Sequence, residues 1–215
     1  DYALRSMIRA REAQSSGAFE NEITPFNLAL KKGDYAVMQD EQPLNAKPEK
    51  IPHLKPAFRA DGSVTAANAS SISDGAAALI LSSQTHMQQA GLPCRARILG
   101  HTSHAQEPAW FSTAPIFATR KLLDRLNWRV EDVDLWEVNE AFAVVPMAFM
   151  NELDISGDII NVHGGACALG HPIGASGARI IVTLLHAMER RDVKRGIAAV
   201  CIGGGEGTAI ALERP

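Results

Sequence analysis

The second half of the sequence alternates between segments typical of buried strands and segments typical of amphipathic helices. The clearest helix is predicted at residues 176–191, where Ile180, Leu184 and Met188 share one face. The remaining segments predict helices at 113–125 and 140–151 and strands at 95–100, 133–138, 159–162, 197–202 and 208–212. Alternation of this kind predicts a layered α/β domain.

The first part of the sequence is less regular. Residues 1–18 carry apolar side chains at helical spacing and predict a helix with no capping residue at its start. Prolines interrupt residues 21–56 and predict an irregular region of short pieces. The apolar run at 76–81 suits a strand buried on both faces, and such a strand needs neighbours.

Composition limits the classes of protein to which the chain can belong. Its 21 Lys and Arg against 24 Asp and Glu give a net charge of −3, which provides no general attraction for nucleic acid. Three cysteines argue against a disulfide-stapled secreted module and for a reducing compartment, so we expect a cytoplasmic location. No apolar run approaches the length of about 18 residues that a membrane span needs. The chain opens on Asp1 rather than Met, so we expect a fragment.

Two candidate functional residues follow apolar strands, where α/β folds place their sites. Asn139 follows the strand at 133–138, although an Asn at this point equally suits the cap of the next helix. Cys201 precedes Gly203-Gly204-Gly205, whose unhindered N–H groups suit an oxyanion. A core cysteine before a tight turn is the alternative explanation.

The glycine-rich stretch at residues 161–179 contains a third candidate, His171. Five of its 19 residues are glycine, which permits close backbone approach and positive φ angles. His171 lies between Gly170 and Pro172 just before a predicted helix, and this glycine density favours a functional role over a structural one. A histidine and a cysteine on glycine turns can act as an acid–base pair if the fold brings them together.

Other chemistry-bearing side chains have simpler explanations. His101 and His104 have a spacing that suits a metal ion, but no cysteine or carboxylate pattern accompanies them, so we predict no metal site. Trp110, Phe111 and Phe117 are expected to fill a core.

Four segments, taken in order, resemble the thiolase family, the acyl-CoA C-acyltransferases. The most specific is Gly170-His171-Pro172-Ile173-Gly174-Ala175-Ser176-Gly177-Ala178-Arg179. The others are Asn68-Ala69-Ser70 with Asp74-Gly75-Ala76-Ala77, then Asn139-Glu140-Ala141-Phe142, then residues 201–205 with Gly207. The resemblance covers essentially all 215 residues but only about the second half of a family member.

The resemblance implies roles in the reversible Claisen condensation and thiolysis of a 3-ketoacyl-CoA such as acetoacetyl-CoA, within fatty acid metabolism. His171 is implied as the base that deprotonates a nucleophilic cysteine, and it shares an oxyanion site with a water positioned by Asn139. Cys201 is implied to take the α-proton during condensation or to return it during thiolysis. The N–H of Gly203 is implied to form half of a second oxyanion hole, because both an enolate and a tetrahedral intermediate need stabilisation.

The resemblance also implies how the substrates bind. Ser70 is implied to hydrogen-bond the pantetheine arm of coenzyme A, with Phe58 and Phe142 packing along the same channel. The implied substrates are acetyl-CoA or a 3-ketoacyl-CoA together with CoA, and neither a cofactor nor a metal is expected. The bulk of Trp110 and Phe111 leaves the acyl-chain length open.

The implied fold is the C-terminal half of a thiolase, with part of its α-β-α-β-α sandwich. We expect residues 1–60 to be a remnant of a loop or cap region, 61–92 the last segment of the N-terminal thiolase domain, and 93–215 the C-terminal thiolase domain. The family's nucleophilic cysteine lies in the first half, and none of Cys94, Cys167 and Cys201 stands in that motif. The expected partners are therefore the missing N-terminal half and further copies in a homodimer or homotetramer, and the isolated chain is predicted to be inactive.

Two other functions compete with this prediction. A non-catalytic thiolase-like module would bind CoA thioesters or pair with another subunit without turning substrate over. A ketoacyl synthase is disfavoured, because those relatives use a second histidine where Cys201 provides a thiol.

Overall fold

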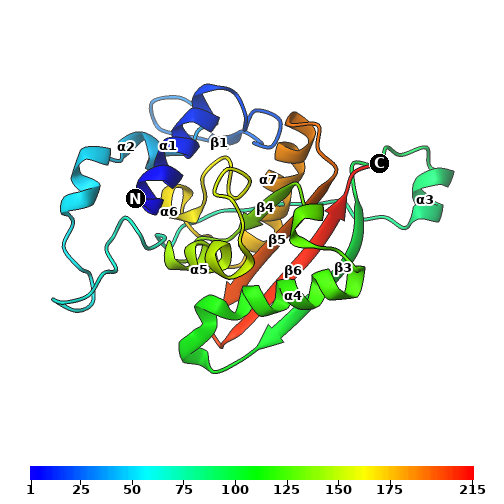
Figure 1. Cartoon of the computed structure of the whole chain (residues 1–215). Helices are drawn as coiled ribbons and strands as arrows, with labels where there is room; N and C mark the ends of the chain where they lie inside the picture. Colours follow the sequence, from blue (N-terminus) through cyan, green and yellow to red (C-terminus); the bar gives the residue numbers. More distant parts are fainter.

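The computed structural model describes residues 1–215 and is built around a four-stranded sheet (Figure 1). In spatial order its strands are β3 (Arg97–Ala105), β6 (Glu206–Glu213), β5 (Arg195–Ile202) and β4 (Leu135–Val138). Strand β6 is antiparallel to both of its neighbours, whereas β4 and β5 are parallel.

Helices pack on both faces of this sheet, which confirms the predicted layered α/β fold. One face carries α4 (Ala114–Leu126) and α5 (Val144–Leu153), and the other carries α7 (Ser176–Arg190). Successive side chains of β5 point to opposite faces, so Ile197 joins the α4 side of the core and Ala198 the α7 side. Three short helices complete the connections: η2 (Pro108–Thr113), η3 (Val130–Asp132) and α6 (Ala166–Leu169).

The predicted N-terminal helix forms as α1 (Tyr2–Ser15) and lies against the layered part of the chain. Met7 and Ala10 on its buried face contact Ala168 of α6. Arg9 anchors the same helix through hydrogen bonds of 2.8 Å to each of the carbonyl oxygens of Gly157 and Ile160. Apolar side chains and one arginine therefore hold this helix against the glycine-rich stretch.

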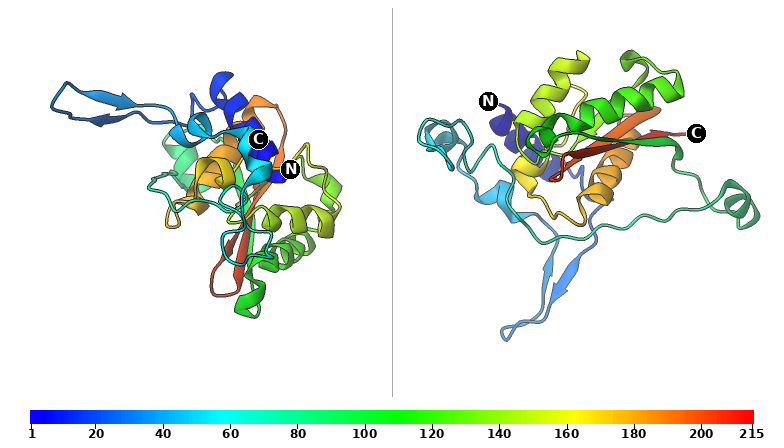
Figure 2. Two further views of the ribbon diagram at one scale, coloured as in Figure 1. Left: turned by 90° about the vertical axis from the view of Figure 1, so that its left-hand side faces the viewer. Right: turned by 90° about the horizontal axis from the view of Figure 1, so that it is seen from below.

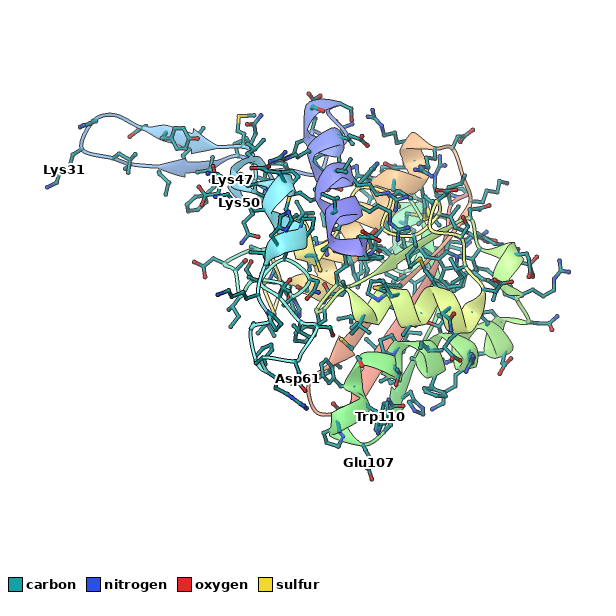
Figure 3. All side chains as sticks on the ribbon, turned by 60° about the vertical axis from the view of Figure 1, so that its left-hand side comes forward. Lys31, Lys47, Lys50, Asp61, Glu107 and Trp110 are labelled. Carbon is teal, nitrogen blue, oxygen red and sulfur yellow. The ribbon has the colours of Figure 1, made fainter.

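The region from 21 to 92 consists of short pieces, as the prolines of its first part predict. Strands β1 (Phe26–Leu28) and β2 (Tyr35–Val37) form an antiparallel hairpin, followed by α2 (Glu41–Asn45), η1 (Pro48–His53) and later α3 (Gln84–Gln89). The hairpin and α3 project away from the sheet (Figure 2), and Lys31 lies at the hairpin tip (Figure 3). No helix of the chain combines the length and apolar composition that crossing a membrane requires.

The strand predicted at residues 76–81 does not form. These residues make no backbone hydrogen bond to another segment, and the side chains of Ile80 and Leu81 are 97% and 74% exposed. A strand buried on both faces needs a neighbour on each edge and a layer over each face. The 215 residues supply neither neighbouring strands nor covering layers for this run. The prediction of a strand is therefore wrong for this chain.

Two further predictions are corrected near the end of β4. Residues 159–162 form only two isolated bridges, from Ile160 to Trp136 and from Val162 to Gly164, because Asn161 has a φ of 45°, which a strand cannot accommodate. The helix predicted at 140–151 begins four residues later, as α5. The preceding residues are instead held by the 68–70 segment, since Ser70 N–H donates to the Ala141 carbonyl oxygen at 3.0 Å.

Candidate active site

His171 lies on the turn between α6 and α7. Gly170 precedes it with a φ of 84°, a conformation that favours glycine, and an added Cβ there would collide with the side chain of Ser73. The His171 N–H donates to the Ser71 carbonyl oxygen at 2.9 Å. The turn is therefore fixed by its contact with the segment around Ser71, and the glycine makes that contact possible.

The two ring nitrogens of His171 have different partners. Nδ1 lies 2.6 Å from Ser176 Oγ, and that hydroxyl donates to the Pro172 carbonyl oxygen at 3.0 Å. Because Ser176 has only one proton to donate, it accepts a hydrogen bond from Nδ1–H. The lone pair then lies on Nε2, 3.3 Å from the amide nitrogen of Asn139. Burial and, secondarily, the charge of Arg179 lower the pKa of His171, so Nε2 is an unprotonated base at neutral pH.

Asn139 is fully buried just beyond the last residue of β4. It does not cap the next helix, because α5 has Ala143 at its N-cap position. Its N–H donates to the Ala199 carbonyl oxygen of β5 at 2.9 Å, and its side-chain nitrogen faces His171. Its Oδ1 atom has no hydrogen-bond partner in the chain, and a buried amide oxygen of this kind ordinarily receives a donor such as water.

Cys201 is the second-last residue of β5 and is 7% exposed. Burial raises the pKa of its thiol to about 11, so the group is protonated at neutral pH. The chain then turns back into β6 through the three glycines, where Gly205 has a φ of 100°. Gly203 is exposed on this turn, with open space where a side chain would stand.

The parallel pairing of β4 and β5 brings Asn139 and Cys201 to one edge of the sheet. The carboxyl ends of adjacent parallel strands meet at the same edge, and Ala199, which bonds Asn139, lies two residues before Cys201. His171 joins this edge through Asn139. No hydrogen bond links His171 directly to Cys201.

The three residues implied in coenzyme A binding differ in how the rest of the chain holds them. Both the N–H and the hydroxyl of Ser70 donate to the Ala141 carbonyl oxygen, at 3.0 and 2.9 Å. Phe142 forms a bridge with Ala69 and packs edge-on against Phe111, with 6.2 Å between ring centroids. Phe58 is exposed and makes no aromatic contact with Phe111 or Phe142.

Sequence reasoning missed the parts played by two residues, Ser176 and Glu140. Ser176 orients the imidazole, and its position five residues after His171 at the start of α7 was the available signal. Glu140 is a fully buried carboxylate directly after Asn139. Its burial has no sequence signal, because its hydrogen-bond donors come from segments up to 138 residues away.

Comparison with known proteins finds two family models that match the chain. The model described as "Thiolase, N-terminal domain" matches residues 1–85, and the one described as "Thiolase, C-terminal domain" matches residues 92–214. Together they account for nearly the whole chain.

Individual relatives agree with the family models. An acetyl-CoA acetyltransferase from Pseudomonas aeruginosa is 49% identical over 99% of this chain and 55% of its own length. The crystal structure of the Bacillus anthracis acetyl-CoA acetyltransferase superposes with a TM-score of 0.95 at 43% identity, over 99% of this chain and 54% of that one. The Ascaris suum Acat5 thiolase in complex with coenzyme A gives a TM-score of 0.88 at 39% identity, over 100% of this chain and 55% of that one. The chain thus spans about half the length of the relatives that it matches.

Proposed function

Because the chain belongs to the thiolase family, we propose that it supplies the acid–base part of an acyl-CoA C-acyltransferase site. The reaction is the reversible condensation and thiolysis of a 3-ketoacyl-CoA such as acetoacetyl-CoA. The observation that carries the proposal is the neutral imidazole of His171, whose Nε2 lone pair faces Asn139 at the sheet edge that also holds Cys201.

His171 acts as the base in this proposal. Its Nδ1–H is held by Ser176, so the ring presents Nε2 to a thiol and can deprotonate it. The buried, unpartnered Oδ1 of Asn139 supports a water site beside the ring. That water and the resulting imidazolium together donate hydrogen bonds to a thioester oxyanion.

Cys201 exchanges the α-proton. In thiolysis, the nucleophilic thiolate attacks the 3-keto carbon, the bond between C2 and C3 breaks, and the electron pair remains on the acetyl-CoA enolate. The Cys201 thiol, protonated because its pKa is about 11, gives its proton to the enolate carbon. In condensation the same proton returns to Cys201, and the N–H of Gly203 supports the oxyanion of the other intermediate.

The coenzyme A moiety lies along the 68–70 segment in this proposal. The Ser70 hydroxyl already donates to Ala141, so it meets the pantetheine amide as an acceptor. Phe142 and Phe58 provide apolar surface to the same arm. No cofactor or metal takes part in these steps.

The nucleophilic cysteine is supplied from outside these 215 residues. Cys167 is a poor nucleophile, because burial and the neighbouring Glu140 raise the pKa of its thiol. Cys94 lies outside the site, in the connection between α3 and β3. The exposed apolar residues at 76–81, and a pocket of about 210 Å³ between α7 and the sheet lined by residues such as Ile181 and Ile210, support a missing N-terminal half that covers them.

The proposal includes the division of the chain into a loop or cap remnant at 1–60, the last segment of the N-terminal thiolase domain at 61–92 and the C-terminal thiolase domain at 93–215. It also includes a homodimeric or homotetrameric assembly. All three cysteines are free thiols, which supports a reducing, cytoplasmic location.

A chimera tests the proposal. The part of the Pseudomonas aeruginosa relative that precedes its match to this chain is fused before Asp1, and CoA-dependent cleavage of acetoacetyl-CoA is followed. We expect turnover by the chimera and none by the 215-residue chain. Turnover by the isolated chain contradicts the role given to the missing cysteine. A folded chimera that binds acetyl-CoA without turnover favours the non-catalytic module.

A further inference from the structure

Glu140 is fully buried, and its carboxylate accepts four hydrogen bonds. Oε1 accepts from the Tyr2 hydroxyl at 2.9 Å and from Asn161 Nδ2 at 3.0 Å. Oε2 accepts from the Ser6 hydroxyl at 2.7 Å and from the Cys167 N–H at 3.0 Å. All four donors are uncharged, so the burial of this carboxylate is compensated by hydrogen bonds alone.

These donors come from three segments that are far apart in the sequence. Tyr2 and Ser6 belong to α1, Asn161 to the connection between α5 and α6, and Cys167 to the first turn of α6. Glu140 itself follows β4. One side chain therefore joins the N-terminal helix, the end of the edge strand β4 and the glycine-rich stretch.

The glycine-rich stretch is shaped to receive this carboxylate. An added Cβ at Gly165 would collide with the Glu140 carboxylate, and one at Gly164 would lie 2.5 Å from the Ser6 carbonyl oxygen. The Ser6 hydroxyl also accepts the Gly165 N–H at 3.0 Å. Two of the glycines that sequence reasoning associated with catalysis therefore make room for Glu140 and α1.

The Glu140 network reaches both sides of the contact between Asn139 and His171. On one side, Asn161 accepts from the Val138 N–H and donates to the Val138 carbonyl oxygen, each at 2.8 Å, and Val138 directly precedes Asn139. On the other side, the Cys167 N–H opens α6, which ends two residues before His171.

We propose that Glu140 is a positioning residue, which holds the end of β4 and the start of α6 at the separation that keeps Asn139 against His171 Nε2. The proposal rests on the proposed function, because that function gives the contact its catalytic purpose. The role proposed for Glu140 thus differs from that of Asn139, which contacts His171 directly.

A carboxylate suits this position better than an isosteric amide. An amide nitrogen at the Oε2 position would face the Cys167 N–H, and at the Oε1 position it would face Asn161 Nδ2. Each orientation sets a donor against a donor. Glu140→Gln therefore keeps the shape of the side chain but breaks the network on one side.

The experiment is ¹⁵N NMR of the 215-residue chain labelled at histidine, with His171 assigned through His171→Gln. In the unchanged chain we expect the Nδ1–H tautomer and a pKa lowered by burial. In Glu140→Gln we expect a mixed tautomer signal and a His171 pKa that moves up toward its ordinary value as the ring becomes exposed. Hydrogen-exchange mass spectrometry is expected to show faster amide exchange in the peptide that contains Cys167.

A matched control separates positioning from general loosening. Arg11→Gln removes another anchor of α1, its hydrogen bonds to the carbonyl oxygens of Pro43 and Ala46, without touching Glu140 or its four donors. We expect it to lower the melting temperature while leaving the His171 signals unchanged. If Glu140→Gln does not fold, Tyr2→Phe removes a single donor and is expected to shift the His171 signals in the same direction by less.

Two results overturn the proposal: unchanged His171 signals in folded Glu140→Gln or Tyr2→Phe, or an equal change in Arg11→Gln. The histidine spectra do not depend on turnover. An inactive chimera with the expected spectra therefore refutes the proposed function and leaves the structural coupling intact.

Discussion

The layered region at residues 93–215 and the region at 21–92 use their apolar residues in opposite ways. In the layered region, Leu122, Phe149 and Ile197 are almost completely buried between helices and sheet. In the other region, large apolar side chains are exposed at Phe26, Leu30, Tyr35, Met38, Phe58, Ile72, Ile80 and Leu81. Soluble chains rarely expose so many without a partner surface. The layered region builds its own core, whereas residues 21–92 leave these side chains outside any core.

The largest expected effect comes from a matched pair of phenylalanines, one in each region. Phe149→Ala removes a side chain with 0% exposure that packs edge-on against Trp136, and it should lower the free energy of unfolding by roughly 3–5 kcal/mol. Phe58→Ala removes a ring that is 76% exposed, and it should change that free energy by less than about 0.5 kcal/mol. Urea denaturation measures both, and equal losses would erase the distinction between the regions.

An intermediate effect is expected where the two regions meet. Glu22 packs against α7, where it accepts a hydrogen bond from Thr183 at 3.2 Å, and burial raises its pKa from 4.5 to about 7. The folded state therefore keeps a proton that the unfolded chain has released, so stability falls as pH rises from 4.5 to 7. The contribution of this group is at most about 3 kcal/mol.

Glu22→Gln is expected to make this decline shallower, because the amide does not titrate. Unfolding free energies at pH 5 and pH 8 measure the slope, and Glu12→Gln, on the exposed face of α1, serves as the control. An unchanged slope in Glu22→Gln would show that the carboxyl group does not sense the α7 interface.

The smallest effect is expected at the exposed run 76–81. Ile80→Ser should change the stability of the isolated chain by less than about 0.5 kcal/mol, because the side chain is 97% exposed. In the chimera the same change should cost clearly more, if the N-terminal half covers this run. Thermal denaturation of both forms compares them, and an equal response would mean that the run stays exposed in the longer protein.

The sequence predicted the parts of the fold that depend on local pattern. The period of α7 and the apolar runs of β4 and β5 were sufficient, because these elements find their partners inside the chain. The run at 76–81 has the same apolar character and forms no strand. A strand depends on neighbours, and local pattern cannot tell whether they are present.

The contact between His171 and Asn139 was predictable in its residues more than in its geometry. The glycine-rich string and the end of β4 pointed to His171 and Asn139, which the structure brings into contact. The hydrogen bonds of Glu140 were not predictable, because two of them form only when α1 packs against the glycine-rich stretch. Buried polar networks join residues that are distant in the sequence and leave no periodic signal.

The most direct test of the acid–base account is exchange of the acetyl-CoA α-protons in D₂O, followed by mass spectrometry with the chimera and its variants. We expect Cys201→Ala to abolish exchange while acetyl transfer between CoA molecules continues, and His171→Ala to abolish both. Full α-proton exchange in Cys201→Ala would contradict the account.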